Sequence, residues 1–515
     1  MNPNEQLDLK LHETLSSESE DKLTADILVK NIKDSGVALF HDQYEDAYLS
    51  PDGSGRVIYK ISSKKCKLWI LHYPYIKHKQ VVGSDIVKRV KETLEADALF
   101  GGKEHKLHVR NYRNDEGIWY DLGDSAVLIN STGWKVVDNP PIVFKRFSHQ
   151  KHQVNPIKGG DVRQLFKYIN VEDKESQILI LVFIISAFIP DFPHPLLILY
   201  GPQGAGKTTP MMVMKSLIDP SSMINGSTAP SDYTELIQML SHHSFTYFDN
   251  LSKLPEWLSD ALARAATGDS FSKRELFSDD DDVIYYIQKT IALNGINQVV
   301  YKSDLLDRSI LIQLQRISPD KRKESQIFWA EFYKDQPAIL GSIFDILSKA
   351  LNIYPNVKLS ELPRMADFGR WGYAIAEAAG YSGYDFISAY DNNVVIQHEE
   401  AIEASPVAQA ILTYMEHKDK WQGTPAELYK ELYRIATTDL EIANSKSWPS
   451  DAARLGRSLS IIIPNLQAKG INLERSRSKE RLITITKTTV VSDVTDAKEV
   501  KDTPVVDSTT AATIK

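Results

Sequence analysis

The chain has 515 residues, enough for about three domains of ordinary size. Hydrophobic residues make up 42% and charged residues 25%, a balance typical of globular proteins, and the formal net charge of −8 excludes a uniformly basic nucleic-acid coat. The single cysteine, Cys66, excludes an internal disulfide and a site built from several thiolates. This cysteine usage fits a reducing compartment, so we expect a cytoplasmic protein.

The first residues are polar and acidic and lack the basic-then-apolar order of a signal peptide. We expect residues 1–36 to be a mobile segment followed by a short amphipathic helix from Lys22 to Asp34. The longest apolar run, Ile178 to Ile189, is shorter than the ~20 residues that a membrane span needs. It predicts a buried helix that ends at Pro190, and no membrane contact.

Residues 37–170 alternate short apolar runs with turn signals such as PDGSG and DNPP, which predicts a small α+β accessory domain. One helix is expected from Ser84 to about Ala96, with Ser84 as its N-cap. The expected strands are VALFHD, RVIYKI, KLHVRNY, GIWYDLG, AVLIN, WKVVD and IVFKRF.

Long helices then alternate with short apolar strands over residues 171–400, the pattern of an α/β domain with a mostly parallel sheet. Residues 401–487 predict a smaller helical unit that ends in two strands, GINLERSR and RLITITK. Residues 488–515 contain no aromatic residue, no leucine and no glycine, so we expect a disordered tail.

The strongest local signal is a phosphate-binding loop. An apolar run, LLILY, leads directly into GPQGAGKT, which matches G-x-x-x-x-G-K-[ST] at every fixed position. The glycines let backbone N–H groups point at phosphate oxygens, and the following helix adds its positive N-terminal end. Lys207 is expected to reach the β- and γ-phosphates of ATP, and the Thr208 hydroxyl to bind Mg²⁺. The predicted nucleotide-binding residues are Gly201, Pro202, Gln203, Gly204, Ala205, Gly206, Lys207, Thr208 and Thr209.

A second signal is HHSFTYFDN, an apolar run that ends in Asp249. A carboxylate there can hold the magnesium ion through water, so Thr208 and Asp249 are the predicted metal residues. The alternative is that Asp249 caps the next turn. Asn250 follows where many related ATPases carry a second acid. Either Asp249 does both jobs, or another carboxylate such as Glu256 or Asp269 helps.

Two further residues complete the predicted catalytic set of Lys207, Asp249, Asn294 and Arg308. KTIALNGIN predicts a strand with Asn294 at its carboxyl end, where an amide can bond the γ-phosphate or the attacking water; the alternative is an ordinary Asn-Gly turn. Arg308 precedes the next strand and could stabilise charge on a neighbouring subunit's γ-phosphate. Its alternative is a local ion pair with Asp304 or Asp307.

The order of these motifs resembles the superfamily 3 helicases of viruses, plasmids and other mobile elements, which are AAA+ ATPases. DNLSKLPEWLSDALARAATGDSFSKRELF and LPRMADFGRWGYAIA also resemble primase- or helicase-like ATP-binding proteins of phages and integrated elements. The resemblance implies an α/β P-loop NTPase core of AAA+ type, and a ring homo-oligomer, most simply a hexamer, with Arg308 acting in trans. It also implies a DNA-gripping hairpin with Lys273 and Arg274, although both could be plain surface charges and the Asp279–Asp282 run would repel phosphate.

The C-terminal unit resembles a winged helix, with first helices from Ser405 to about His417 and from Pro425 to about Ala436, and a recognition-type helix over 451–469. Between Ile442 and Lys487 there are nine Lys or Arg against three Asp or Glu, which is the contrast that a nucleic-acid footprint needs. The alternative is a protein-binding winged helix. The candidate DNA-contacting residues are Arg454, Arg457, Arg475, Arg477, Lys479 and Arg481.

Together these features predict an ATP- and Mg²⁺-dependent, helicase-like motor of a mobile element or virus, acting on single-stranded or forked DNA in replication, with replication proteins as further partners. The main alternative is an ATP-dependent switch or loader that remodels a protein–DNA complex without unwinding. A third reading places primase activity in residues 37–170. It is disfavoured because Glu116, Asp121 and Asp124 lack a partner histidine for metal binding.

Overall fold

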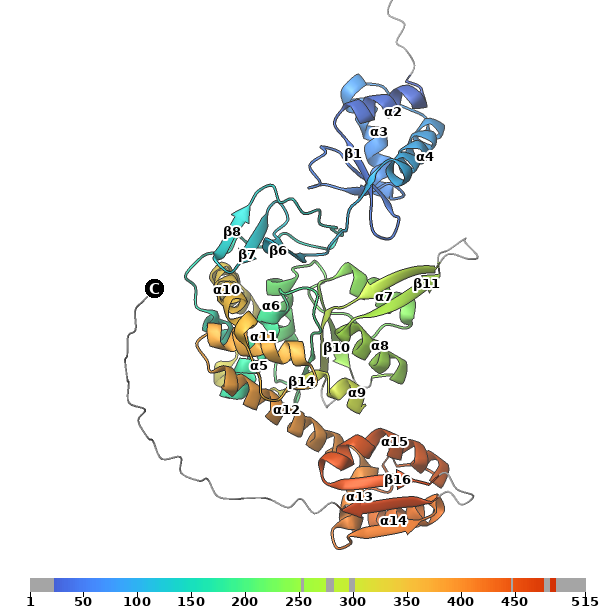
Figure 1. Cartoon of the computed structure of the whole chain (residues 1–515), viewed down its shortest axis with the longest axis vertical. Coiled ribbons are helices and arrows are strands. Elements are labelled where there is room, and N and C mark those ends of the chain that lie inside the picture. The colour runs from blue at the N-terminus through green and yellow to red at the C-terminus, as the bar shows by residue number, and fades with distance from the viewer. Residues whose placement is uncertain are drawn as a thin grey trace, which may run out of the picture. The chain divides into compact units, whose positions relative to one another are not determined.

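The computed structural model describes residues 23–251, 254–274, 282–295, 302–445, 448–476 and 482–487. The chain forms two compact units, Met1–Ala404 and Ser405–Lys515 (Figure 1). Helix α12 (Gly383–Glu403) runs through the boundary expected at residue 400. The expected mobile start of the chain and the tail 488–515 lie outside the described residues.

The first part of the larger unit packs three helices on a four-stranded sheet of order β3-β2-β1-β4. Its core is a separate hydrophobic cluster that includes Leu28, Leu49, Ile70 and Leu94. The elements are α2 (Ala25–Asp34), β1 (Ala38–His41), β2 (Ala47–Ser50), β3 (Tyr59–Lys60), α3 (Lys64–His78), α4 (Ser84–Phe100) and β4 (Lys103–Glu104).

Several local predictions for this region are wrong. Helix α3 was not predicted; it carries Pro74 in its interior, and its apolar residues form no clear stripe. The N-cap of α4 is Gly83 rather than Ser84, which is the first helical residue. RVIYKI contributes a strand of two residues, and IVFKRF contributes an isolated bridge between His108 and Phe144.

A second, antiparallel sheet follows, with the order β5-β6-β7-β8. Its strands are β5 (Asn111–Asn114), β6 (Gly117–Asp121), β7 (Ala126–Asn130) and β8 (Gly133–Val137). KLHVRNY becomes a strand only at its end, because Arg110 adopts a positive φ of 69° and breaks the extended run. Tyr120, Ile129 and Trp134 share one hydrophobic cluster with the helices of the next region. The region expected as a single accessory domain over 37–170 therefore has no single core: its first part has a cluster of its own, and its second sheet shares one with the following helices.

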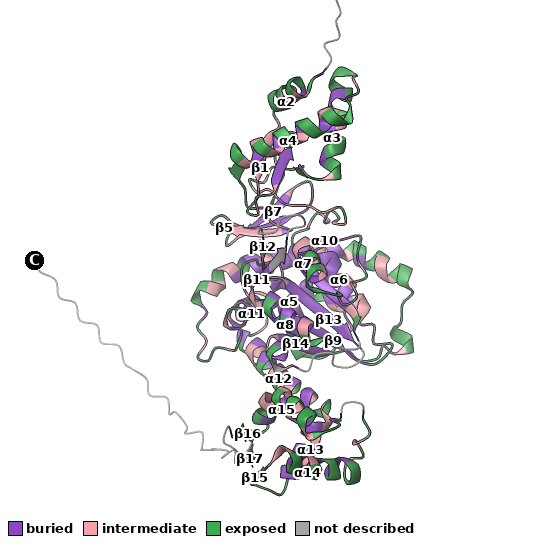
Figure 2. Cartoon of the chain, turned by 90° about the vertical axis from the view of Figure 1, so that its right-hand side faces the viewer, coloured by how far each residue is buried: buried purple, intermediate pink, exposed green. Residues whose placement is uncertain are grey.

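The next region is built on a parallel sheet of order β10-β13-β9-β14. Leu197 and Leu199 of β9 join one hydrophobic cluster, and Leu196 and Ile198 join the other, so the strand is buried on both faces (Figure 2). The sheet strands are β9 (Leu196–Tyr200), β10 (Phe245–Leu251), β13 (Thr290–Gly295) and β14 (Ser309–Gln313), and β11 (Asp269–Arg274) with β12 (Asp282–Ile287) forms a separate antiparallel hairpin.

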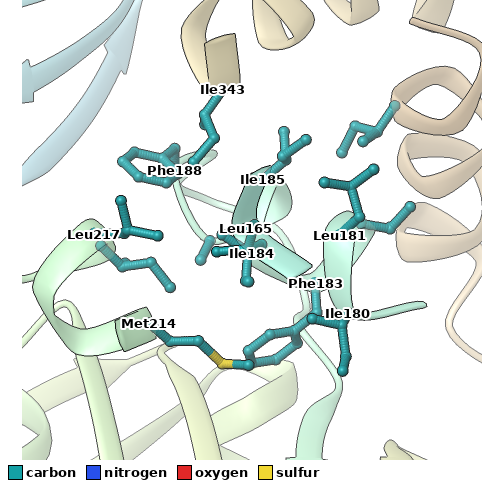
Figure 3. Packing of buried hydrophobic residues seen from close by; sticks show 14 of the residues in the cluster. Leu165, Ile180, Leu181, Phe183, Ile184, Ile185, Phe188, Met214, Leu217 and Ile343 are labelled. Atoms are coloured by element: carbon teal, nitrogen blue, oxygen red, sulfur yellow. The ribbon is translucent and has the colours of Figure 1, made fainter. Parts of the chain in front are cut away.

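Helices cover this sheet, and the predicted buried helix is among them. It is α5, which ends at Ser186, three residues before the end of the apolar run. Figure 3 shows its side chains packed against α6 and α10. No helix in the described ranges has the length and apolarity to cross a membrane. The helical elements are η1 (Val162–Lys167), α5 (Lys174–Ser186), α6 (Thr208–Ile218), α7 (Tyr233–His242), α8 (Glu256–Thr267), α9 (Ser303–Leu306), η2 (Pro319–Lys321), α10 (Ser325–Ile353), η3 (Tyr354–Asn356), α11 (Ala366–Ala378) and α12.

A buried group of charges joins the end of α6 to the second sheet. Asp219 is fully buried and receives Arg110 Nε at 3.2 Å and Lys215 Nζ at 2.8 Å. Lys215 also donates to the Phe245 carbonyl at the start of β10, at 2.6 Å. Burial by itself raises the pKa of Asp219, but Lys215, His243 and Arg110 outweigh it and hold the pKa well below its usual value. Asp219 therefore stays ionised at neutral pH.

The smaller unit alternates helices and strands in the order helix, strand, helix, helix, strand, strand. The strand Lys420–Gly423 was not predicted, and it completes an antiparallel sheet of order β15-β17-β16. Thr424 and Glu427 form a capping box at the start of the second helix. The elements are α13 (Pro406–Met415), β15 (Lys420–Gly423), α14 (Pro425–Thr438), α15 (Ala452–Ala468), β16 (Ile471–Arg475) and β17 (Ile483–Lys487).

Candidate nucleotide-binding site

The predicted phosphate-binding loop connects β9 to α6, and its glycines are required by its shape. Gly201 and Gly206 have φ values of 146° and 71°. A Cβ on Gly201 would stand 2.3 Å from the Leu314 carbonyl oxygen, and one on Gly206 would stand 2.8 Å from Ile317 Cδ1. Any other residue at either position would therefore strain the backbone and collide with the segment that follows β14.

The loop offers free backbone donors to an anion. Within the described ranges, the backbone N–H groups of Gly204, Gly206 and Lys207 have no protein acceptor. These groups lie at the start of α6, where the helix dipole adds positive potential. The loop therefore fits a phosphate chain, the ligand that its sequence predicts.

Lys207 lies on the rim of the same loop. Its Nζ donates to the carbonyls of Gly201, at 2.8 Å, and Pro202, at 3.1 Å. Burial lowers the pKa of Lys207, and the nearby Asp249 carboxylate acts in the opposite direction. A phosphate oxygen is a stronger partner for an ammonium group than a backbone carbonyl, so a bound nucleotide would draw this side chain onto itself.

Thr208 and Asp249 lie together, as a magnesium site needs. The Thr208 hydroxyl donates to Asp249 Oδ1 at 3.3 Å, although the residues belong to α6 and β10. Both offer hard oxygen ligands, which Mg²⁺ prefers. The described residues contain no cluster of three or more His, Cys, Asp or Glu that could hold a metal ion. Thr208 and Asp249 would therefore hold Mg²⁺ only together with oxygen ligands from elsewhere, such as a bound nucleotide.

Asn294 lies on β13, between β10 and β9, and not in an Asn-Gly turn. Its Oδ1 accepts the Asn250 backbone N–H at 2.7 Å. Its Nδ2 is buried and has no partner among the described residues, so the NH₂ group, with its two donors, remains for a ligand. Asp269, one of the carboxylates expected to help, is 2.5 Å from Arg264 Nε in an ion pair at the base of the hairpin.

Arg308 forms the local ion pair that was its alternative reading. Its Nη1 donates to the backbone carbonyl of Asp304, at 2.6 Å, and to the Asp304 carboxylate. Arg364 binds the same carboxylate at 2.7 Å and also pairs with Asp307. Asp304 therefore has a second cationic partner that would remain if Arg308 turned away.

Arg316, which follows β14, was not among the predicted site residues. Arg316 Nε lies 3.7 Å from the point that a Cβ on Gly204 would occupy, and the next residue, Ile317, donates its N–H to the Gly204 carbonyl at 3.2 Å. The Arg316 side chain is exposed beside the loop. The sequence feature that could have indicated Arg316 is its position just after a strand of the parallel sheet, at the edge where ligands bind in such sheets.

The DNA-contact candidates are described in part. Lys273 and Arg274 end β11, and their side chains lie outside the described residues, as do Arg477, Lys479 and Arg481. In the smaller unit, Arg454 and Arg457 are exposed on α15. Arg475 Nη2 donates to the Gly456 carbonyl at 2.6 Å, which brings β16 against the same helix.

Two family models of replication proteins match parts of this chain. Residues 162–394 match the family model described as an actinomycete integrative conjugative element replication protein, and residues 407–500 match the AICE RepA C-terminal domain. The two matches together cover more than half of the chain. No curated protein matches.

Solved structures of the C-terminal region of NrS-1 are also similar to this chain, at 10% sequence identity. Two of them have TM-scores of 0.41 and 0.42, and each match covers 91% of this chain and 100% of the other. A third has a TM-score of 0.39 and covers 89% and 98%.

Proposed function

We propose that this chain, a replication protein of a mobile element, is an ATP- and Mg²⁺-dependent motor of the superfamily 3 type that acts on DNA. One observation carries the proposal. Three neighbouring parallel strands bring the phosphate loop, Asp249 and Asn294 to one edge of the sheet, with the Thr208 hydroxyl 3.3 Å from the Asp249 carboxylate. This arrangement is the one that phosphoryl transfer from ATP to water needs.

In this proposal each side chain has a distinct role. Lys207 would turn from the loop carbonyls to neutralise the β- and γ-phosphates, and Thr208 with Asp249 would hold Mg²⁺, which would spread the charge on those phosphates. The free Nδ2 of Asn294 donates to the γ-phosphate or to the attacking water. Arg316, beside Gly204, adds a guanidinium on the same side as the phosphate chain.

Two features of the smaller unit support a role on DNA. Its order of helix, strand, helix, helix, strand, strand is the order of a winged helix, and exposed arginines lie on α15, the helix in the recognition position. A switch or loader without unwinding is the second candidate. Asn250 favours it, because an amide at that place cannot accept a proton from water as a second carboxylate can.

One experiment separates the two candidates. ATPase activity is measured with and without single-stranded DNA, beside strand displacement on forked duplexes. Hydrolysis that DNA stimulates, together with displacement, supports the motor. Hydrolysis without displacement on any fork supports the switch, and no hydrolysis in either condition contradicts both.

Asp249→Asn tests the magnesium acid. We expect turnover to fall by about 100-fold or more while ATP still binds, because the backbone of the loop holds the phosphates and the amide is a poor ligand for Mg²⁺. Phosphate release and fluorescent-nucleotide binding measure the two quantities. Asp260→Asn is the matched control, since Asp260 is exposed and pairs with Lys302. Normal hydrolysis by Asp249→Asn would place the magnesium acid elsewhere.

Arg308→Ala tests action in trans. We expect a loss of about 10³-fold or more in turnover, as for other arginine fingers, with ATP affinity within a few-fold. The unfolding temperature should change little, because Arg364 still neutralises Asp304. Mixing this variant with Lys207→Ala should restore partial activity, since some interfaces then combine an intact arginine with an intact loop. No recovery in rings shown to contain both variants would make Arg308 a structural partner of Asp304.

A further inference from the structure

The larger unit contains a second candidate site, a cavity of about 730 Å³ that no residue of the phosphate-binding loop lines. Its wall includes the base of the β11–β12 hairpin, the segment before β5 and the residues just after α5. The volume is in the range of sites that hold small organic ligands. The residues that line it include Lys106, His108, Phe147, Tyr285, Tyr286 and Lys289.

The wall of this cavity is positively charged. Four lysines line it against two aspartates, Asp46 and Asp191. Lys60 pairs with Asp46, at 2.5 Å, and Lys145 pairs with Asp42, at 3.4 Å. For the ammonium groups of Lys106 and Lys289, no carboxylate lies within ion-pair distance among the described residues. Lys106 is exposed and therefore available to an anion. Burial lowers the pKa of Lys289, and an anion in the cavity would act in the opposite direction, as Asp219 and Asp191 do.

The positive charge of Lys106 and Lys289 also affects His108, which lies beside them. Burial, with Lys289 and Lys106, lowers the pKa of His108 to about 4, so its ring is neutral at neutral pH. The ring lies 3.9 Å from that of Tyr112, centroid to centroid. The site thus joins two cationic groups to an uncharged aromatic surface.

More flat rings line the same wall. Tyr285 lies 5.0 Å from Tyr44, and Phe147 stacks on His242 at 3.9 Å, both measured between ring centroids. Tyr286, the next residue along the hairpin, is 61% exposed. Proteins that bind single strands without reading their sequence combine basic grooves with such aromatic faces, on which bases stack.

We infer that this cavity binds a nucleotide unit of a single-stranded nucleic acid, with a backbone phosphate on Lys106 and Lys289 and a base against the aromatic wall. The inference rests on the proposed action on DNA. The cavity would be a DNA contact at the base of the β11–β12 hairpin. It is separate from Lys273 and Arg274 at the far end of β11 and from the candidate arginines of the smaller unit. A free nucleotide has the same chemistry, and the test distinguishes the two sources.

Lys106→Glu is the first variant, because Lys106 is exposed and its replacement should not disturb the fold. The full chain is titrated into a fluorescent dT oligonucleotide at several salt concentrations, and anisotropy gives the affinity. We expect binding about tenfold weaker, with a smaller salt dependence, because one phosphate contact is lost and one repulsion is added. Lys135→Glu is the matched control: it makes the same charge change at an exposed residue of β8 outside the cavity. Equal affinity of Lys106→Glu and the unmodified protein overturns the inference.

Tyr286→Ala and a competition experiment test the base and its source. Loss of the exposed ring should weaken oligonucleotide binding by about fivefold or more without changing the salt dependence, because stacking carries no charge. The mononucleotide dTMP should compete poorly. If dTMP competes at concentrations similar to those of the oligonucleotide, the ligand of the cavity is a free nucleotide and not a single strand. If the unmodified protein does not bind the oligonucleotide, the inference is overturned. The ATPase activity of the unmodified protein tests the proposed function independently.

Discussion

Lys207→Ala is expected to abolish nucleotide binding and turnover while leaving the fold intact. The ammonium group contacts two loop carbonyls in this structure, and both can be solvated when the side chain is removed. Its replacement therefore costs little stability, whereas the β- and γ-phosphates lose their nearest cation. We expect fluorescent-ATP binding to fall by about 100-fold and phosphate release to fall by at least as much.

Thermal unfolding of Lys207→Ala supplies the check on folding, and Lys321→Ala supplies the matched control. Lys321 is exposed and pairs at the surface with Glu172. It should bind and hydrolyse ATP as the unmodified chain does. Undiminished turnover in a folded Lys207→Ala protein would contradict both the assigned loop and the proposed motor.

Asp219→Ala is expected to produce the largest loss of stability. It leaves Arg110 and Lys215 buried without their shared carboxylate, and breaking a buried pair in this way costs about 3–5 kcal/mol. Chemical denaturation followed by tryptophan fluorescence measures the change. The matched control is Asp385→Ala, because Asp385 pairs with Lys174 at 2.7 Å on the surface, where such a pair contributes less than about 1 kcal/mol. Equal losses in the two variants would show that the buried group stabilises the fold no more than a surface ion pair does.

The same group predicts a pH dependence. The pKa of Asp219 is held well below its unfolded value, so its contribution to the free energy of unfolding is complete above the unfolded pKa of about 4. That contribution is lost as the pH falls through the lower, folded value. The difference in stability between the unmodified chain and Asp219→Ala should therefore stay constant near neutral pH and shrink only in acid.

The elements that form the candidate nucleotide site could be predicted from the sequence because each signal is local. The strand that precedes the phosphate loop is buried on both faces and reads as an unbroken apolar run, LLILY, and the loop follows a fixed spacing. Asp249 and Asn294 were found because each follows such a run. Strands exposed on one face gave weaker patterns, and the edge strand Lys420–Gly423 gave none.

Contacts between distant segments could not be predicted. Arg110 and Asp219 are far apart in the chain, and neither has a local motif that indicates the other. The antiparallel sheet was placed in an accessory domain because the pattern of a strand shows which residues are buried but not which helix covers them. Arg316 was missed for the same reason, since its distance from Gly204 depends on the order of strands in the sheet.

Because of the sheet β5–β8, the folding unit is longer than the region that the family model matches. The matched replication-protein region begins at residue 162, after this sheet ends. Yet the Tyr120 hydroxyl donates to the Ile218 carbonyl at the end of α6, at 3.0 Å, and Trp134 Nε1 donates to Asp345 of α10 at 2.7 Å. A fragment cut at residue 162 would expose the apolar surface that these residues cover. A fragment that keeps this core covered must begin before Asn111, where β5 starts. Packing, and not the position of the motifs, therefore sets the N-terminal boundary of the folding unit.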